Sequence, residues 1–221
     1  MSEFTNPLLT AWGYIADTAS MADLLTAQEF SNYTAGKFGS DTRITANIPA
    51  ASSSIRNFCG WHISPSLTCG MLYRVADLRD YFVGPDLLIQ LPATFISSVS
   101  KIVVDAKLNE LTQEYEGDIM TDYDLTTSGL LRIYDVGIRD RKSQIFIKYT
   151  AGLSGDATPA IKELAANMVT HAVTSSYGVN SETAGGVSVS YSSTWAGQSG
   201  STALTNDTRD TLDAYKVKGV Y

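Results

Sequence analysis

The chain offers few residues whose types could carry acid-base or metal chemistry. Its two histidines are His62 and His171, and neither stands in a motif that supplies a partner carboxylate. An imidazole becomes catalytic when a carboxylate orients it, and it holds a metal only together with further ligands. We therefore expect His62 in a connection after Trp61 and His171 at the edge of a helix, neither with a catalytic or metal role.

The cysteine count also argues against a chemical centre. Cys59 and Cys69 are the two cysteines, too few for a disulfide framework or a thiolate zinc site. We expect two reduced, partly buried thiols. The sequence thus predicts no catalytic residues, no cofactor-binding residues, no metal ligands and no bound cofactor.

Three short segments match known motifs only in part, because the neighbouring residues or the expected secondary structure do not fit. Ser98 and Lys101 have the Ser-x-x-Lys spacing of penicillin-recognising enzymes, but that serine begins a helix and the pattern here predicts a strand. Asp118, Asp122 and Asp124 miss the spacing and the closing glutamate of a calcium loop. Residues 197–202 have the glycines of a phosphate loop without its lysine. The sequence predicts that the protein is not an enzyme.

Aromatic residues remain as candidates for function. Trp61 is expected in the core, where a helix meets a sheet. Trp195, Tyr215 and Tyr221 lie in segments that cannot form a core alone, and tryptophan and tyrosine are enriched at interface hot spots. They are either anchors for a partner or surface aromatics without a role. With Lys216 they form the candidate partner-binding set.

Helical patterns stand at both ends of the chain. Thr26 and Glu29 have capping-box spacing and predict a helix from about Ala27 to Ala35, which Gly36 ends. A second helix, ended by Gly60, either starts near Asn47 or kinks there, because Pro49 is costly outside a first turn; the start near Asn47 is favoured. A short final helix is expected at about 206–217. A third helix begins at Pro159, and it buries one apolar face formed by Ile161, Leu164, Ala165, Met168, Val169, Ala172 and Val173.

Between these helices the pattern is that of strands. Residues 67–150 alternate, are rich in β-branched and aromatic side chains, and contain turn signals at 83–86, 116–118 and 127–129. They predict about five or six short antiparallel strands. The fold class is therefore α+β, a small helical core of about four helices with an inserted antiparallel β-rich lobe.

Four boundaries follow from these patterns. Residues 1–23 are predicted to be a flexible N-terminal arm that becomes ordered on a neighbour, and residues 24–221 a single domain. The β-rich insertion covers about 66–152, and a Ser/Gly-rich loop covers about 178–203, with one strand or hairpin arm near 186–191.

Composition excludes several classes of protein. The net charge is -7 and the sequence pI is about 4.7, without a basic run, which argues against a surface that seeks nucleic-acid phosphates. No stretch has the apolar length of a membrane span, and the N-terminus lacks the features of a signal peptide. We expect a protein that is made in a cytoplasm and has no membrane partner.

Several segments together resemble a known family. Leu24–Phe30, Ile55–Pro65, Tyr149–Gly152, and the Ile161-Lys162 helix followed by Val187–Tyr191 are similar to the head–tail connector, or adaptor, proteins of tailed bacteriophages. The order of elements matches from Leu24 onward. In this resemblance, Gly60 and Trp61 are the joint between the helical core and the β lobe.

The resemblance implies a structural virion protein of the neck, between head and tail. Such a protein forms a homo-oligomeric ring, a dodecamer, below the portal protein, extends the DNA channel, and offers a platform for a tail-side neck or tail-completion protein. Viral DNA passes through it without sequence-specific binding, and the acidic balance suits that role. The alternative is a small-molecule or carbohydrate-binding module with an aromatic pocket; a hydrolase without a recognisable motif is the weakest interpretation.

Overall fold

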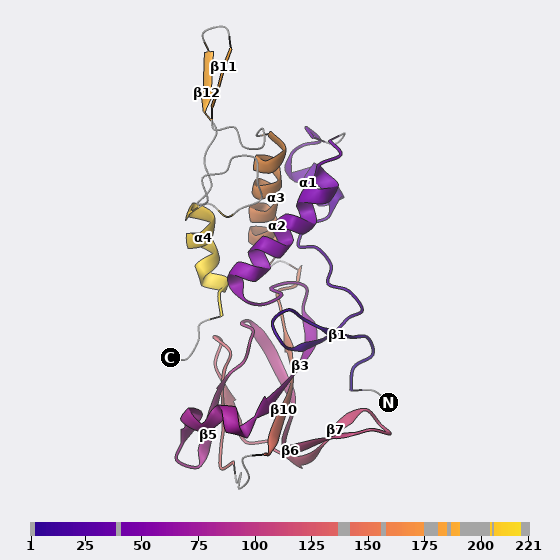
Figure 1. Ribbon diagram of the computed structural model, residues 1–221, viewed down its shortest axis with the longest axis vertical. Coiled ribbons are helices and arrows are strands. Elements are labelled where there is room, and N and C mark those ends of the chain that lie inside the picture. The colour runs from indigo at the N-terminus through magenta and orange to yellow at the C-terminus, as the bar shows by residue number, and fades with distance from the viewer. Residues whose placement is uncertain are drawn as a thin grey trace. The chain divides into compact units, whose positions relative to one another are not determined.

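The structure of the protein is a computed structural model that describes residues 3–38, 41–136, 142–155, 158–174, 181–184, 187–190, 204 and 206–217. The chain divides into two compact units, and Figure 1 labels many of their elements. The first comprises residues 1–21, 60–153 and 217–221, and the second comprises 22–59 and 154–216. With helices and two main antiparallel sheets, the fold is α+β, as predicted. That residues 24–221 act as a single domain stays a prediction.

A six-stranded antiparallel sheet forms the frame of the first unit. Its order is β1 (Pro7–Leu9), β2 (Ile15–Asp17), β3 (Leu67–Arg74), β10 (Gln144–Ala151), β6 (Ile96–Asn109) and β7 (Glu114–Ile119). β10 pairs with β3 on one side and β6 on the other, and its Ile145, Ile147 and Tyr149 are fully buried. The β-branched and aromatic residues that predicted strands here fill the centre of the sheet.

A second sheet of four short strands completes the first unit. Its order is β4 (Phe82–Val83), β5 (Asp86–Gln90), β9 (Leu130–Ile133) and β8 (Tyr123–Leu125), and the 3₁₀ helix η1 (Val75–Tyr81) leads into it. Every pairing is antiparallel, as predicted. Eight described strands lie between Leu67 and Ala151, more than the five or six predicted. Strands of two or three residues, such as β4 and β8, are too short to leave a periodic pattern in the sequence.

The prediction of an arm without structure of its own at residues 1–23 was wrong for the part that forms β1 and β2. β2 pairs with β3 through Ile15 with Gly70 and Ala16 with Cys69. Tyr14 and Ala16 are fully buried. Strands of three residues show no clear period, so the pattern alone could not reveal them.

Residues before β1 are also held on the sheet. Phe4 is 5% exposed and packs with Val103, Ala106 and Phe146. Lys148 Nζ donates to the backbone oxygen of Glu3 at 2.7 Å, and Lys101 Nζ lies 3.3 Å from the Glu3 carboxylate. The sheet therefore binds this segment by apolar burial and by charge.

The second unit contains the helices. They are α1 (Ala27–Tyr33), α2 (Ile44–Cys59), α3 (Pro159–Thr174) and α4 (Asn206–Leu212), followed by the 3₁₀ helix η3 (Asp213–Tyr215). The predicted capping box is present: Thr26 Oγ1 accepts from the Glu29 N–H at 3.2 Å, and the Glu29 carboxylate accepts from the Thr26 N–H at 2.8 Å. α1 ends at Tyr33, slightly before the predicted end, with Gly36 at φ 74° beyond it.

The predicted start of α2 near Asn47 was wrong, because the helix begins at Ile44 and contains Pro49. Proline has no N–H to donate and costs about 3 kcal/mol inside a helix. The additional turn places Ile44 and Ile48 on the buried face, at 6% and 5% exposure, and this burial offsets the lost bond. The end of α2 at Cys59, before Gly60 at φ 79°, is as predicted.

α3 follows its prediction closely. It begins at Pro159, after Thr158, and buries Ile161, Met168 and Val169 on one face. A hairpin of β11 (Ser181–Ala184) and β12 (Val187–Ser190) follows, where a strand or hairpin arm was expected. Most of the Ser/Gly-rich stretch at 178–203 lies outside the described residues. None of the helices in the described part of the chain has the length and apolar character to cross a membrane.

Candidate functional site

His62 lies at the centre of a buried hydrogen-bond network in the first unit. Its side chain is fully buried; Nε2 is 3.0 Å from the Ala151 carbonyl oxygen and Nδ1 is 2.6 Å from the Tyr14 hydroxyl. Because a carbonyl can only accept, Nε2 carries the proton and Nδ1 accepts from the hydroxyl. The hydroxyl oxygen in turn accepts from the His62 backbone N–H at 3.0 Å.

Backbone geometry fixes this network in place. Gly152, at φ 120°, passes so close that an added Cβ would lie 2.3 Å from the Pro65 oxygen and 2.8 Å from His62 Nε2. The Leu153 N–H donates to the Ile63 oxygen at 2.7 Å. His62 therefore joins β2, the connection after α2 and the end of β10. These hydrogen bonds stabilise the fold, and the sequence pattern did not indicate the partner Tyr14.

The two cysteines are buried free thiols, as expected. Cys59 is at the end of α2 and its Sγ lies 3.8 Å from the Leu212 oxygen, whereas Cys69 is on β3. Burial raises the pKa of each thiol to about 12. A thiolate, not a thiol, is the nucleophile, so neither side chain is activated for chemistry.

The Ser-x-x-Lys match has no catalytic geometry. Ser98 and Lys101 both lie on β6, opposite Thr150 and Lys148 of β10, and the pairing shifts register between them. Lys101 pairs with Glu3, as described above. The strand predicted from the alternation is confirmed, and with it the absence of the helical turn that this chemistry requires.

The three aspartates considered for calcium are divided between different elements. Asp118 is on β7 of the six-stranded sheet, and Asp124 is on β8 of the four-stranded sheet. Asp124 accepts a short hydrogen bond from the Tyr134 hydroxyl, which raises the pKa of that phenol. Among the described residues, no group of three or more histidine, cysteine or carboxylate side chains is placed to hold a metal ion.

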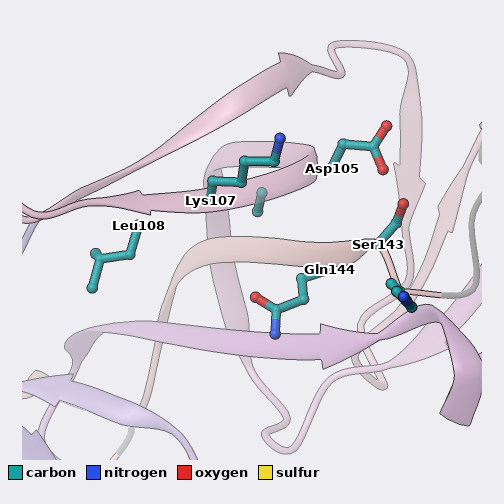
Figure 2. Close-up of a pocket in the computed structure, with 7 residues that line it drawn as sticks. Asp105, Lys107, Leu108, Ser143 and Gln144 are labelled. Atoms are coloured by element: carbon teal, nitrogen blue, oxygen red, sulfur yellow. The ribbon is translucent and has the colours of Figure 1, made fainter.

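An open hollow lies where β6 bulges beside the start of β10 (Figure 2). Its volume is about 510 Å³, and Figure 2 shows Asp105 and Lys107 extending from β6 and Gln144 from β10. In this view the Gln144 amide points away from the Asp105 carboxylate. The lining also contains Ser143, Lys142 and Leu108, and we assign no chemistry to it.

Tryptophan rings do not form an open platform in the described part of the chain. Trp61 is fully buried, as expected, with Phe95 stacked on it at 6.2 Å between ring centroids. Trp12 stacks on Tyr14 at 6.1 Å. A second hollow, in the second unit, contains Tyr33 and Phe38, but the Lys37 ammonium lies over the Phe38 ring at 5.5 Å.

The candidate partner-binding residues are only partly described. Trp195 and Tyr221 lie outside the described residues, whereas Tyr215 and Lys216 are at the end of η3. Lys216 Nζ lies 5.0 Å from the centre of the Phe58 ring, and the Arg209 guanidinium lies 5.5 Å from the same ring. Lys216 therefore also helps to hold the final helix on α2. That these four residues bind a partner stays a prediction.

The described residues thus define an α+β protein in which the polar groups singled out by the sequence serve its own packing. Its family follows from comparison with known proteins. The chain matches the head completion protein family over residues 23–216 and belongs to it. Its role is therefore structural, in the assembly of the bacteriophage head and as part of the virion. A comparison with the curated proteins finds no match.

Proposed function

We propose that this protein forms a closed ring of identical subunits, a dodecamer, in the neck of the virion. The ring docks below the portal protein, extends the DNA channel, and offers an attachment platform for a tail-side neck or tail-completion protein. Membership of the head completion family over residues 23–216 is the observation that carries this proposal. In this role the protein has no catalytic function.

The negative charge of the chain suits a channel that must not bind the DNA passing through it. Each subunit contributes a net charge of -7, and the edge strand β7 carries Glu114, Glu116 and Asp118. Protein surfaces that bind DNA neutralise its phosphates with lysine and arginine. An acidic ring repels the phosphates instead, so DNA passes without sequence-specific binding.

The experiment that tests the ring is a mass measurement in solution, on the full chain alone and mixed with the portal protein. We expect a ring-sized particle, formed by the chain itself or on the portal. A strict monomer that ignores the portal contradicts the proposal. The alternative function, a small-molecule or carbohydrate-binding module, predicts instead a monomer that binds such a ligand in an aromatic pocket.

Docking on the portal is assigned to the C-terminal set of Trp195, Tyr215, Lys216 and Tyr221. We expect deletion of Tyr215 to Tyr221 to weaken portal binding while far-UV circular dichroism shows an unchanged monomer fold. The deletion also removes the contact of Lys216 with Phe58. Phe58→Leu is therefore the control, because it removes that contact and keeps the tail. Unchanged portal binding by the truncated chain refutes the assignment.

A further inference from the structure

The six-stranded sheet ends in two different edges, β1 and β7, both labelled in Figure 1. We infer that neighbouring subunits join by pairing β1 of one copy with β7 of the next, so that the sheet continues from subunit to subunit. This inference rests on the ring of the proposed function and names the contact that closes it. The partner is a second copy of this chain.

Among the described residues, the β1 edge offers a backbone position without a strand partner and an exposed apolar side chain. The Thr10 N–H donates to the Tyr14 oxygen, so the Thr10 backbone faces β2. Backbone groups alternate in direction along an antiparallel strand, and Leu9 therefore faces away from the sheet. Its side chain is 73% exposed. β1 has three residues, and Pro7, whose backbone has the same direction as that of Leu9, has no N–H to donate, so a neighbouring strand would bond this edge mainly at Leu9.

The β7 edge has the same features. The Met120 N–H donates to the Ile102 oxygen, so Met120 faces β6 and the preceding Ile119 faces outward. The Ile119 side chain is 66% exposed. The hairpin formed by β6 and β7 also carries Leu111, at 96% exposure, in its turn. Both edges therefore present unpaired backbone beside apolar surface that a neighbour would cover.

Charge disfavours the pairing of β7 with a second β7. β7 carries three acids at alternate positions, Glu114, Glu116 and Asp118. Two β7 strands paired with each other would place these acids close together, and like charges on facing strands are destabilising. Residues 4–16, which include β1, contain no charged side chain. β1 can therefore lie beside β7 without repulsion.

The direction of the strands also favours pairing of β1 with β7 of a neighbouring subunit. All five pairings within the sheet are antiparallel, and the number of strands is even. β1 and β7 of one subunit therefore run in opposite directions. A neighbour related by rotation about the ring axis places its β1 antiparallel to β7, which continues the alternation. A contact between two unlike surfaces gives a ring when the rotation between subunits closes, whereas a contact between like surfaces stops at a dimer.

The test is a disulfide trap across the contact. In the variant L9C/I119C, mild oxidation of rings formed by the full chain, alone or on the portal, is expected to give a ladder of covalent multimers on a non-reducing gel. A disulfide requires Cα atoms within about 7 Å, so it reports direct pairing. The native cysteines are fully buried and do not compete. L9C/L111C is the matched control, because Leu111 is exposed in the turn and not on the edge; it is expected to give no ladder.

A second measurement covers the case in which the cysteines disturb assembly. Leu9→Lys and Ile119→Lys each place a charge on one edge, and each is expected to shift the mass from ring to monomer with an unchanged circular dichroism spectrum. If rings persist in both lysine variants and L9C/I119C gives no ladder, the contact between β1 and β7 is wrong, whereas the ring of the proposed function still stands. A covalent dimer from I119C alone shows β7 pairing with β7 and overturns it also. A wild-type chain that forms no ring refutes the proposed function and this inference with it.

Discussion

Tyr14→Phe is the most informative substitution for the stability of the first unit. The hydroxyl of Tyr14 donates to His62 Nδ1 at 2.6 Å and accepts from the His62 N–H at 3.0 Å. Phenylalanine keeps the ring in its fully buried position, so little apolar burial is lost. The substitution removes only the hydroxyl, which is hydrogen-bonded to two buried polar groups of His62.

The magnitude follows from those two bonds. Leaving a buried donor or acceptor without its bond costs about 1–3 kcal/mol. With two such groups, and some relaxation around them, we expect Tyr14→Phe to lower the free energy of unfolding by about 2–4 kcal/mol. The assay is urea unfolding of the chain followed by tryptophan fluorescence. Trp61 is the reporter, because it is buried beside His62, with 5.3 Å between the ring centroids.

Tyr33→Phe is the matched control, the same chemical change in a different setting. The Tyr33 side chain is 46% exposed, and its hydroxyl donates to the Pro159 oxygen at 3.3 Å. Because water replaces that bond, we expect a loss below about 1 kcal/mol. If Tyr14→Phe costs no more than Tyr33→Phe, the network around His62 does not stabilise the fold.

Three further substitutions or reactions test other parts of the structure. A hydrogen bond with the Lys162 ammonium lowers the pKa of Glu29 below 4.5, so its stabilisation is present above about pH 4.5 and is lost as the pH falls through the lowered folded-state value. Glu29→Gln is therefore expected to cost about 0.5–1 kcal/mol at pH 7 and less at pH 3, measured by urea unfolding; an equal cost at both values contradicts this. Gly70→Ala places a Cβ 2.5 Å from the Phe4 ring and is expected to cost about 1–3 kcal/mol, but clearly less in a Phe4→Ala background; additive losses in a double-mutant cycle rule out this contact. With pKa values of about 12, the two cysteine thiols are expected to react with a thiol reagent at pH 8 only after denaturation, and rapid labelling of the folded chain would show that they are accessible.

Elements with a long period or a local cap could be predicted from the sequence. α3 was predicted because seven apolar residues repeat at helical spacing over its whole length. The capping box of Thr26 and Glu29 was predicted because both partners are three residues apart, so the geometry is local. The strand that contains Ser98 and Lys101 also followed from local pattern, but the register shift between these two residues did not.

Elements that depend on distant partners could not be predicted in this way. β1 and β2 have three residues each and are strands because β3 pairs with β2 from more than fifty residues away. The additional turn of α2 exists despite Pro49, because burial of Ile44 and Ile48 outweighs a local preference. Local propensity is a weak energy per residue, and tertiary burial overrides it.

By itself, the sequence determined the α+β class, the main helices, and the resemblance that membership of the head completion family confirms. These depend on patterns within one segment or on the order of segments, and both can be recognised in the sequence alone. Only the tertiary structure decided that His62 is bonded by Tyr14 and Ala151, that Phe4 is buried on the sheet, and that β1 and β7 are the two edges. The reason is physical: strand order, burial and edge exposure arise from contacts between residues far apart in the chain, and no single segment contains them.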